Sequence, residues 1–251
     1  MDVTAAQGRN RIEITGLSNL RDFGGYATGD GAVIPAGRLF RSAHLGRVPS
    51  AAAPALAALG LRTIIDLRGR EERLKNAPDP AVLGGIAVVP APVEPGSFTS
   101  MIAPDGSAIT AEMNRERILW VYRRFAGDAA AQMGAALVRV YEAAEAPLLI
   151  HCTAGKDRTG FVAATLLRLL GVPEDTVLAD YHLTNDHWDR DYSGNAIFPP
   201  EVVAPLLLAH ADYLGAAFAE IDRVDGSLAA YADRVTGLPD FAARLRDRIL
   251  G

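Results

Sequence analysis

The chain has 251 residues, 49% of them hydrophobic, which is enough to bury the core of one α/β domain with an appendage. Its net charge of −5 excludes a general nucleic-acid binder, because such binding depends on many cationic contacts. A single cysteine excludes an internal disulfide and fits a reducing compartment. Residues 1–10 lack the apolar stretch of a signal peptide, and no apolar run has the length of a membrane span. We therefore expect a cytoplasmic protein, although signal-independent export would leave no mark in the sequence.

The first half of the chain alternates between short strands and helical segments. In chain order, we expect strands at 11–14 and 39–41, a helix at 50–59 capped by Ser50, a strand at 63–67, a charged turn at 69–75 that leads to a short helix, and a strand at 85–89. Residues 90–106 contain four prolines and two glycines, so we expect a loop there.

The second half is mainly helical around one buried strand. In chain order, we expect helices at 109–125 and 129–144, a strand at 148–151, and helices at 159–170, 173–181, 201–218, 227–235 and 240–250. Strands that alternate with helices predict an α/β fold, in which helices cover both faces of a mainly parallel sheet. We treat residues 1–251 as a single domain.

The only cysteine, Cys152, lies where the predicted strand 148–151 turns into a helix. Such a turn directs backbone N–H groups and a helix dipole at one point, which favours a thiolate and can hold a tetrahedral dianion. Arg158 follows at the spacing that lets its planar guanidinium bind two phosphate oxygens. An inert buried cysteine is the alternative, and this electropositive setting argues against it.

The neighbours of Cys152 suggest further roles. The predicted phosphate cradle consists of Thr153, Ala154, Gly155 and Lys156. The side chain of Lys156 adds a cation that favours polyanionic substrates. We expect Thr159 to donate its hydroxyl to the sulfur, and His151 to orient the loop rather than to react.

The segment 151–160, HCTAGKDRTG, resembles the signature loop HCxxGxxR[ST]G of the cysteine-dependent protein tyrosine phosphatase superfamily. Its GKDRTG form is similar to the atypical bacterial branch of mycobacterial secreted and phosphoinositide phosphatases. Four further segments resemble that branch: 19–26 (NLRDFGGY), 37–43 (GRLFRSA), 65–68 (IDLR) and 181–185 (YHLTN). The resemblance implies the tyrosine phosphatase fold and hydrolysis through a phosphocysteine. It also implies that residues 186–236 form a helical lid, for which ordinary core packing is the alternative.

Three carboxylates are candidates for the general acid that protonates the leaving group. We favour Asp157, which in the resembling branch is tied to catalysis, with Asp66 at the end of a predicted strand as its helper. The alternatives are a salt bridge from Asp157 to Arg158 or Lys156, and an anchoring role of Asp66 for Arg68. Asp128 is the third candidate, and helix capping is its alternative role.

Other polar residues are candidates for supporting roles. Arg21, Asp22 and Arg41 are expected to brace the phosphate loop, with surface ion pairs as the alternative. Asn185, His187 and Trp188 are candidates for the substrate mouth, with packing as the alternative. We see no His, Asp and Glu spacing typical of a metal site, and expect no cofactor.

The sequence thus predicts a metal-independent phosphatase. We expect it to act on phosphotyrosine, with phosphoserine, phosphothreonine and phosphoinositides as further candidate substrates. A primarily inositol-lipid phosphatase is the alternative within this class. A catalytically silent phosphate-binding module and a rhodanese-like sulfurtransferase are the alternatives from other classes. The retained nucleophile and acid argue against the first of these, and the loop length argues against the second.

Overall fold

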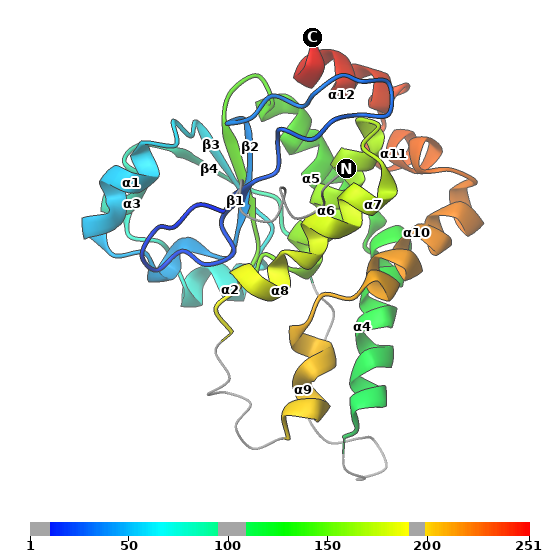
Figure 1. Ribbon diagram of the computed structural model, residues 1–251, viewed down its shortest axis with the longest axis horizontal. Helices are drawn as coiled ribbons and strands as arrows, with labels where there is room; N and C mark the ends of the chain where they lie inside the picture. Colours follow the sequence, from blue (N-terminus) through cyan, green and yellow to red (C-terminus); the bar gives the residue numbers. More distant parts are fainter. Residues whose placement is uncertain (1–10, 95–108, 191–198) are drawn as a thin grey trace.

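The computed structural model describes residues 11–94, 109–190 and 199–251 (Figure 1). Its centre is a sheet with the strand order β1-β2-β5-β3-β4. The strands are β1 (Arg21–Asp22), β2 (Leu39–Ser42), β3 (Thr63–Asp66), β4 (Ala87–Pro90) and β5 (Leu148–His151). Only β1 is antiparallel to its neighbour, so the prediction of a mainly parallel sheet flanked by helices is confirmed.

Helices surround this sheet (Figure 1). The α-helices are α1 (Ala53–Ala57), α2 (Arg70–Lys75), α3 (Pro80–Leu83), α4 (Ala111–Ala126), α5 (Ala130–Ala143), α6 (Asp157–Leu169), α7 (Glu174–His182), α8 (Thr184–His187), α9 (Pro200–Leu207), α10 (Ala211–Asp225), α11 (Leu228–Thr236) and α12 (Phe241–Leu250). Short 3-10 helices cover Leu45–Arg47 and Ser50–Ala52.

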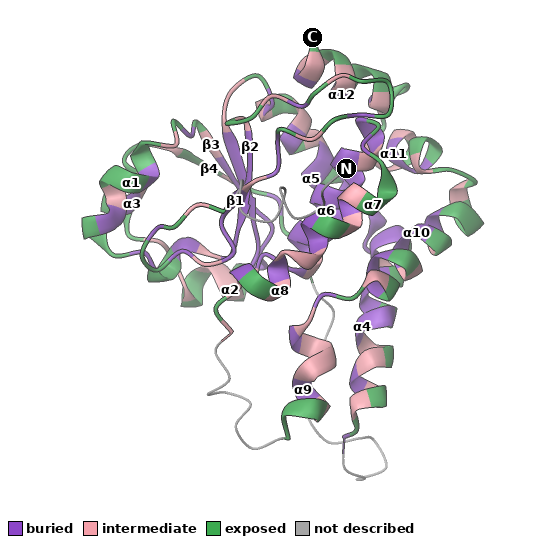
Figure 2. Ribbon diagram, viewed as in Figure 1, coloured by how far each residue is buried: buried purple, intermediate pink, exposed green. Residues whose placement is uncertain are grey.

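The central strand β5 shows why the sheet is covered on both faces. All four of its residues are buried, as Figure 2 shows for the strands at the middle of the molecule. Leu148 and Ile150 belong to the large core formed with α4–α7 and the C-terminal helices, whereas Leu149 belongs to a smaller core under α1 and α3. Because side chains alternate along a strand, a continuous apolar run can serve both cores.

The register of the sheet brings functional segments to one edge. His151 at the end of β5 lies opposite Ser42 of β2 and Asp66 of β3. Parallel strands end at the same edge, so the residues that follow β2, β3 and β5 meet there. This edge receives Cys152 and the loop behind it.

Several predicted elements differ from the structure. Residues 11–14 make only isolated bridges and form no strand. The strand at this edge of the sheet is instead the two-residue β1, which pairs with β2. Ser50 does not cap a helix: it lies within a 3-10 helix, and its hydroxyl donates to Asp79. The turn predicted at 69–75 is mostly the helix α2.

The helix predicted at 201–218 is two helices, α9 and α10, which are bent by 46° where they meet. In the described part of the chain no single helix could cross a bilayer, although this bent pair has the required length and composition. Together with the first half of α4, α9 projects from the body of the molecule (Figure 1).

Candidate active site

The loop between β5 and α6 carries Cys152, which is buried with 2% of its surface exposed. Gly155 in this loop has a φ of 69°, and a Cβ there would lie 2.3 Å from the carbonyl oxygen of Ser42. Only glycine fits both the conformation and the space. The loop therefore packs directly on the end of β2 before α6 begins at Asp157.

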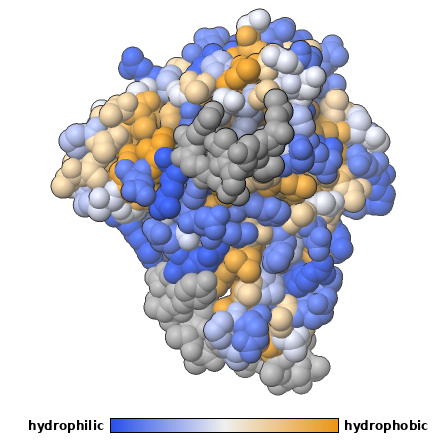
Figure 3. Space-filling view, in the orientation of Figure 1, coloured by the Kyte–Doolittle hydropathy of each residue, from blue (hydrophilic) through white to orange (hydrophobic). Residues whose placement is uncertain are grey.

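A cavity of about 120 Å³ opens above the cysteine. Its lining combines the loop with one face of α4: Ile118, Val121, Phe125, Cys152, Thr153, Ala154, Asp157 and Arg158. Cys152, Arg158 and the favoured acid Asp157 thus line one cavity, together with apolar side chains of α4. Figure 3 shows further apolar side chains at the end of α9 nearest the body of the molecule, bordered by polar surface.

Glu72 of α2 holds the guanidinium of Arg158. Its Oε2 and Oε1 accept from Nη1 and Nη2 of Arg158, each at 2.7 Å, and it also accepts from the hydroxyl of Thr153 and the backbone N–H of Gly69. Burial raises the pKa of Glu72, but the hydrogen bonds and charge of Arg158 outweigh burial and lower it to about 2. Glu72 therefore stays ionised beside Arg158.

These hydrogen bonds determine which edge of the Arg158 guanidinium is available to a ligand. Nη1 also donates to the carbonyl of Val93 at 3.2 Å, whereas the second bond of Nη2, to Thr153, is long at 3.4 Å. No acceptor among the described residues bonds to Nε of Arg158. The edge formed by Nε and Nη2 is thus the one that can bind two phosphate oxygens.

Asp157 faces the same cavity, and one of its oxygens is held firmly. Oδ1 accepts from the hydroxyl of Tyr122 at 3.1 Å and lies 3.1 Å from Nζ of Lys156. No described group bonds to Oδ2. The ion pair that was the alternative role of Asp157 is therefore formed with Lys156, while the second oxygen remains open to a ligand.

Lys156 is almost fully buried, with 1% of its surface exposed. Its Nζ donates to the carbonyls of Leu206 at 2.8 Å and Leu208 at 3.2 Å, and lies 5.8 Å from the centre of the Tyr213 ring. These carbonyls are at the C-terminal end of α9, where a cation is favourable. In this conformation Lys156 connects the loop to α9 and does not line the cavity.

Asp66 does not line the cavity either. Its oxygens accept from Nε and Nη2 of Arg68 at 2.9 and 2.8 Å, and Nε2 of His151 lies 3.7 Å away. Nδ1 of His151 lies 3.1 Å from the carbonyl oxygen of Cys152. The structure thus places Asp66 as the anchor of Arg68 and corrects its expected place beside Asp157, because Arg68 follows closely enough in the chain to take both oxygens.

A buried cluster beneath the loop contains Arg21 and Arg41. Arg41 donates to the carbonyl of Gly155 at 3.0 Å and to Asp180 of α7 at 2.5 Å, and Arg21 donates to Asp180 at 3.1 Å. Burial raises the pKa of Asp180, but the two guanidinium groups outweigh burial and lower it. The surface ion pairs considered for the arginines are therefore excluded, and Asn19, whose Nδ2 donates to Ala154 at 2.9 Å, supports the loop beside them.

Other candidate residues lie elsewhere. Asp22 accepts from the backbone of Gly24 and Gly37 instead of the loop, because it points toward that turn. Asp128 forms an exposed ion pair with Arg124, so neither the acid role nor the capping role of Asp128 agrees with its position. The buried hydroxyl of Thr159 makes no bond to any described group, including the sulfur.

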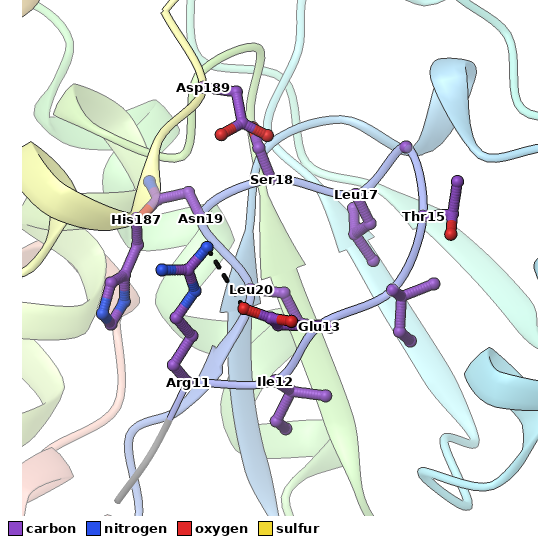
Figure 4. A pocket seen from close by; sticks show the side chains of 12 residues that line it. Arg11, Ile12, Glu13, Thr15, Leu17, Ser18, Asn19, Leu20, His187 and Asp189 are labelled. Atoms are coloured by element: carbon purple, nitrogen blue, oxygen red, sulfur yellow. Dashed lines mark ion pairs between the residues drawn. The ribbon is translucent and has the colours of Figure 1, made fainter. Parts of the chain in front are cut away.

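The proposed substrate mouth is also in a different place. Asn185 bonds to the backbone of Ala209, and Trp188 ends α8. His187 lines a separate cavity of about 480 Å³ formed with residues 11–20 and Asp189 (Figure 4). None of these three side chains reaches the cysteine cavity. Over the described ranges, no group of three His, Cys, Asp or Glu side chains could hold a metal ion.

The residues that sequence reasoning missed are Glu72, Tyr122 and Asp180. Glu72 lies in the charged segment after β3, at the active edge of the sheet, and Asp180 directly precedes the 181–185 segment. These positions are the signals that could have identified them. The sequence gives no such signal for Tyr122, because this residue occupies one of several buried positions of α4 and resembles an ordinary core residue.

Comparisons with known proteins identify the family of this chain. The family model described as the tyrosine phosphatase family matches residues 12–251. A Cupriavidus necator protein named as a tyrosine-protein phosphatase is 34% identical over 238 residues, covering 90% of this chain and 84% of its own. The triple specificity protein phosphatase PtpB of Mycobacterium tuberculosis is 32% identical over 283 residues, covering 95% and 99%. The crystal structure of TpbA from P. aeruginosa is 18% identical, with a TM-score of 0.32, over 73% of this chain and 86% of its own. This chain belongs to the tyrosine phosphatase family.

Proposed function

We propose that this tyrosine phosphatase uses Cys152 as its nucleophile, Arg158 as its phosphate-binding cation and Asp157 as its general acid. The thiolate attacks phosphorus, and the ester bond breaks as Oδ2 of Asp157 gives its proton to the leaving oxygen. Water then attacks the phosphorus of the phosphocysteine and returns a proton to Asp157. The phosphorus–sulfur bond breaks in this step, and phosphate and the thiolate are released. In the second step we expect Thr159, whose buried hydroxyl has no hydrogen-bond partner among the described groups, to turn toward the departing sulfur and stabilise it.

The single observation that carries this proposal is the cavity. It is lined by Cys152 and Arg158 together with Ile118, Val121 and Phe125 of α4. Apolar side chains in the same cavity as a phosphate site suit a flat aromatic ring attached to the phosphate. Phosphotyrosine in a protein is therefore the substrate that the geometry supports best.

A phosphoinositide is the second candidate substrate. The name of the M. tuberculosis relative as a triple specificity phosphatase supports a broad substrate range. The position of Lys156 argues against a second anion site in the conformation described, because its ammonium is bound to Leu206 and Leu208. Binding a polyanion through Lys156 would require α9 to move, as expected if residues 186–236 act as a lid.

Two experiments test these proposals. Cys152→Ser should abolish hydrolysis of p-nitrophenyl phosphate and retain phosphate binding, and a variant that turns over normally would exclude the cysteine mechanism. A panel of phosphotyrosine peptide, phosphoserine peptide and phosphoinositide vesicles should show preference for the first. Lys156→Ala measured on the same panel separates the candidates: selective loss on the vesicles supports the lipid substrate, and equal loss removes it.

A further inference from the structure

Two buried tyrosines lie behind Asp157, on helices far apart in the sequence. Tyr122 of α4 and Tyr181 of α7 are both fully buried, and their hydroxyl oxygens are 2.6 Å apart. The hydroxyl of Tyr122 also lies 3.1 Å from Oδ1 of Asp157. Hydroxyl groups in a core need partners, and these three groups satisfy one another.

Asp157, at one end of this series of hydrogen bonds, determines which groups donate and which accept. Asp157 as a carboxylate can only accept, so the proton of Tyr122 points to Oδ1. The oxygen of Tyr122 is then the acceptor of the Tyr181 hydroxyl. Burial raises the pKa of both tyrosines well above the ordinary value, so both are neutral donors at neutral pH.

The chain of donors selects one oxygen of Asp157 for chemistry. Oδ1 receives the Tyr122 hydroxyl and lies 3.1 Å from the ammonium of Lys156, so both of its lone pairs are occupied. A proton on the carboxyl group must therefore be on Oδ2, the oxygen without a described partner. Since Asp157 lines the cavity with Cys152, that oxygen is the one available to a leaving group.

Tyr181 packs against α6, the helix that follows the loop of Cys152. A Cβ placed at Gly160 of α6 would lie 2.8 Å from a carbon of the Tyr181 ring, so the ring touches the backbone of α6 directly. The ring of Tyr122 packs 6.4 Å from that of Tyr181, centre to centre. The donor chain is therefore built into the core and does not depend on a surface loop.

We propose that Tyr122, supported by Tyr181, is the positioning residue of the general acid: it holds Oδ1 of Asp157 so that Oδ2 delivers the proton to the leaving oxygen. This inference rests on the proposed function of Asp157. In the first step the leaving oxygen takes the proton from Oδ2 as its bond to phosphorus breaks, and the Tyr122 proton stays on its own oxygen. In the second step Oδ2 regains a proton from the attacking water.

The test is the dependence of kcat/KM on the leaving group, because kcat/KM reports cleavage of the ester bond and excludes hydrolysis of the phosphocysteine, which is common to all substrates. Tyr122→Phe should lower kcat/KM on phenyl phosphate, whose phenolate is a poor leaving group, by about tenfold to a hundredfold, the range expected for a hydrogen bond to a charged group. On 2,4-dinitrophenyl phosphate, whose leaving group needs no proton, kcat/KM should stay within about twofold of wild type. Equal losses on both substrates would overturn the proposal, because a merely structural role lowers both rates together.

Two further tyrosine variants serve as a control and as a second test of this inference. Tyr231→Phe is the control, since Tyr231 is also fully buried but donates to the carbonyl of Phe125 at 2.8 Å, and it should show no leaving-group effect. Tyr181→Phe should show a weaker effect in the same direction as Tyr122→Phe, and it carries the test should Tyr122→Phe not fold.

Asp157→Asn identifies which proposal fails. If Asp157→Asn shows no leaving-group effect, the general-acid proposal itself is wrong. If Asp157→Asn shows the effect and neither tyrosine variant does, only the positioning role is wrong. In the double variant the Tyr122 change should add nothing on phenyl phosphate, because its effect passes through Asp157. Additive losses would contradict the inference.

Discussion

The contact between Glu72 and Arg158 makes a quantitative prediction for Glu72→Gln, a change that keeps the shape of the side chain and removes its charge. The pKa of Glu72 falls from an ordinary 4.5 to about 2 in the folded protein. At about 1.4 kcal/mol for each pKa unit, the ionised form contributes about 3 kcal/mol to the free energy of unfolding. Glutamine resembles the protonated form, so the variant should lose about this amount at pH 7.

The pH dependence of this loss has a definite sign. A carboxyl group whose pKa is lowered by folding contributes its full stability above the unfolded value of 4.5, and this contribution disappears as the pH falls through about 2. The difference between wild type and variant should therefore shrink from about 3 kcal/mol at pH 7 to about 1.5 kcal/mol at pH 3.

Urea unfolding at the two pH values measures this difference, in a buffer free of phosphate so that no anion binds Arg158. Glu71→Gln is the matched control, because Glu71 is an exposed residue of the same helix α2 and should show no loss at either pH. An equal loss for Glu72→Gln at both pH values, or no loss, would refute the assigned role. We also expect kcat/KM to fall about tenfold, as the guanidinium is no longer held in one orientation.

Three further predictions follow from the groups around the loop. Asp180→Asn leaves two buried arginines without a carboxylate and should cost about 3–5 kcal/mol in denaturant unfolding, whereas a loss below about 1 kcal/mol would contradict the cluster. Gly155→Ala forces a side chain into a positive φ against β2, so it should cost at least about 2 kcal/mol, and normal thermal stability would show that the loop adopts another conformation. Lys156→Met breaks the bonds to α9 and should speed limited proteolysis of that helix several-fold over wild type; an unchanged rate would show that α9 is held by packing alone.

How far the sequence predicted the site depends on the range of each interaction. Cys152, the loop and Arg158 are contiguous in sequence, so their shared place at the start of a helix followed from local pattern. Arg21 and Arg41 belong to recognisable segments, although their common partner Asp180 was not identified. The sequence could not predict the orientation of Asp66, because a side chain at the end of a strand can point toward the cavity or toward Arg68. In the structure both of its oxygens accept from Arg68.

The helices after the loop show the same limit. One apolar run from 201 to 218 predicts one helix, yet the chain turns between α9 and α10. The sequence predicts that Lys156 binds polyanionic substrates, whereas in the structure its ammonium is bound to α9. Such contacts join residues about fifty positions apart, and no local periodicity reports them.

The predicted nucleophile Cys152 is therefore a property of the sequence, and its environment is a property of the tertiary structure. Residue types and spacing along ten residues predict a nucleophile, an anion cradle and a guanidinium at one helix start, because these depend on backbone geometry over a single turn. Which oxygen of Asp157 is free, which edge of Arg158 faces the phosphate and whether Lys156 is available depend on Tyr122, Glu72 and α9. Only folding brings these partners to the loop, since hydrogen bonds and ion pairs act over a few ångströms in space, whatever the separation in sequence.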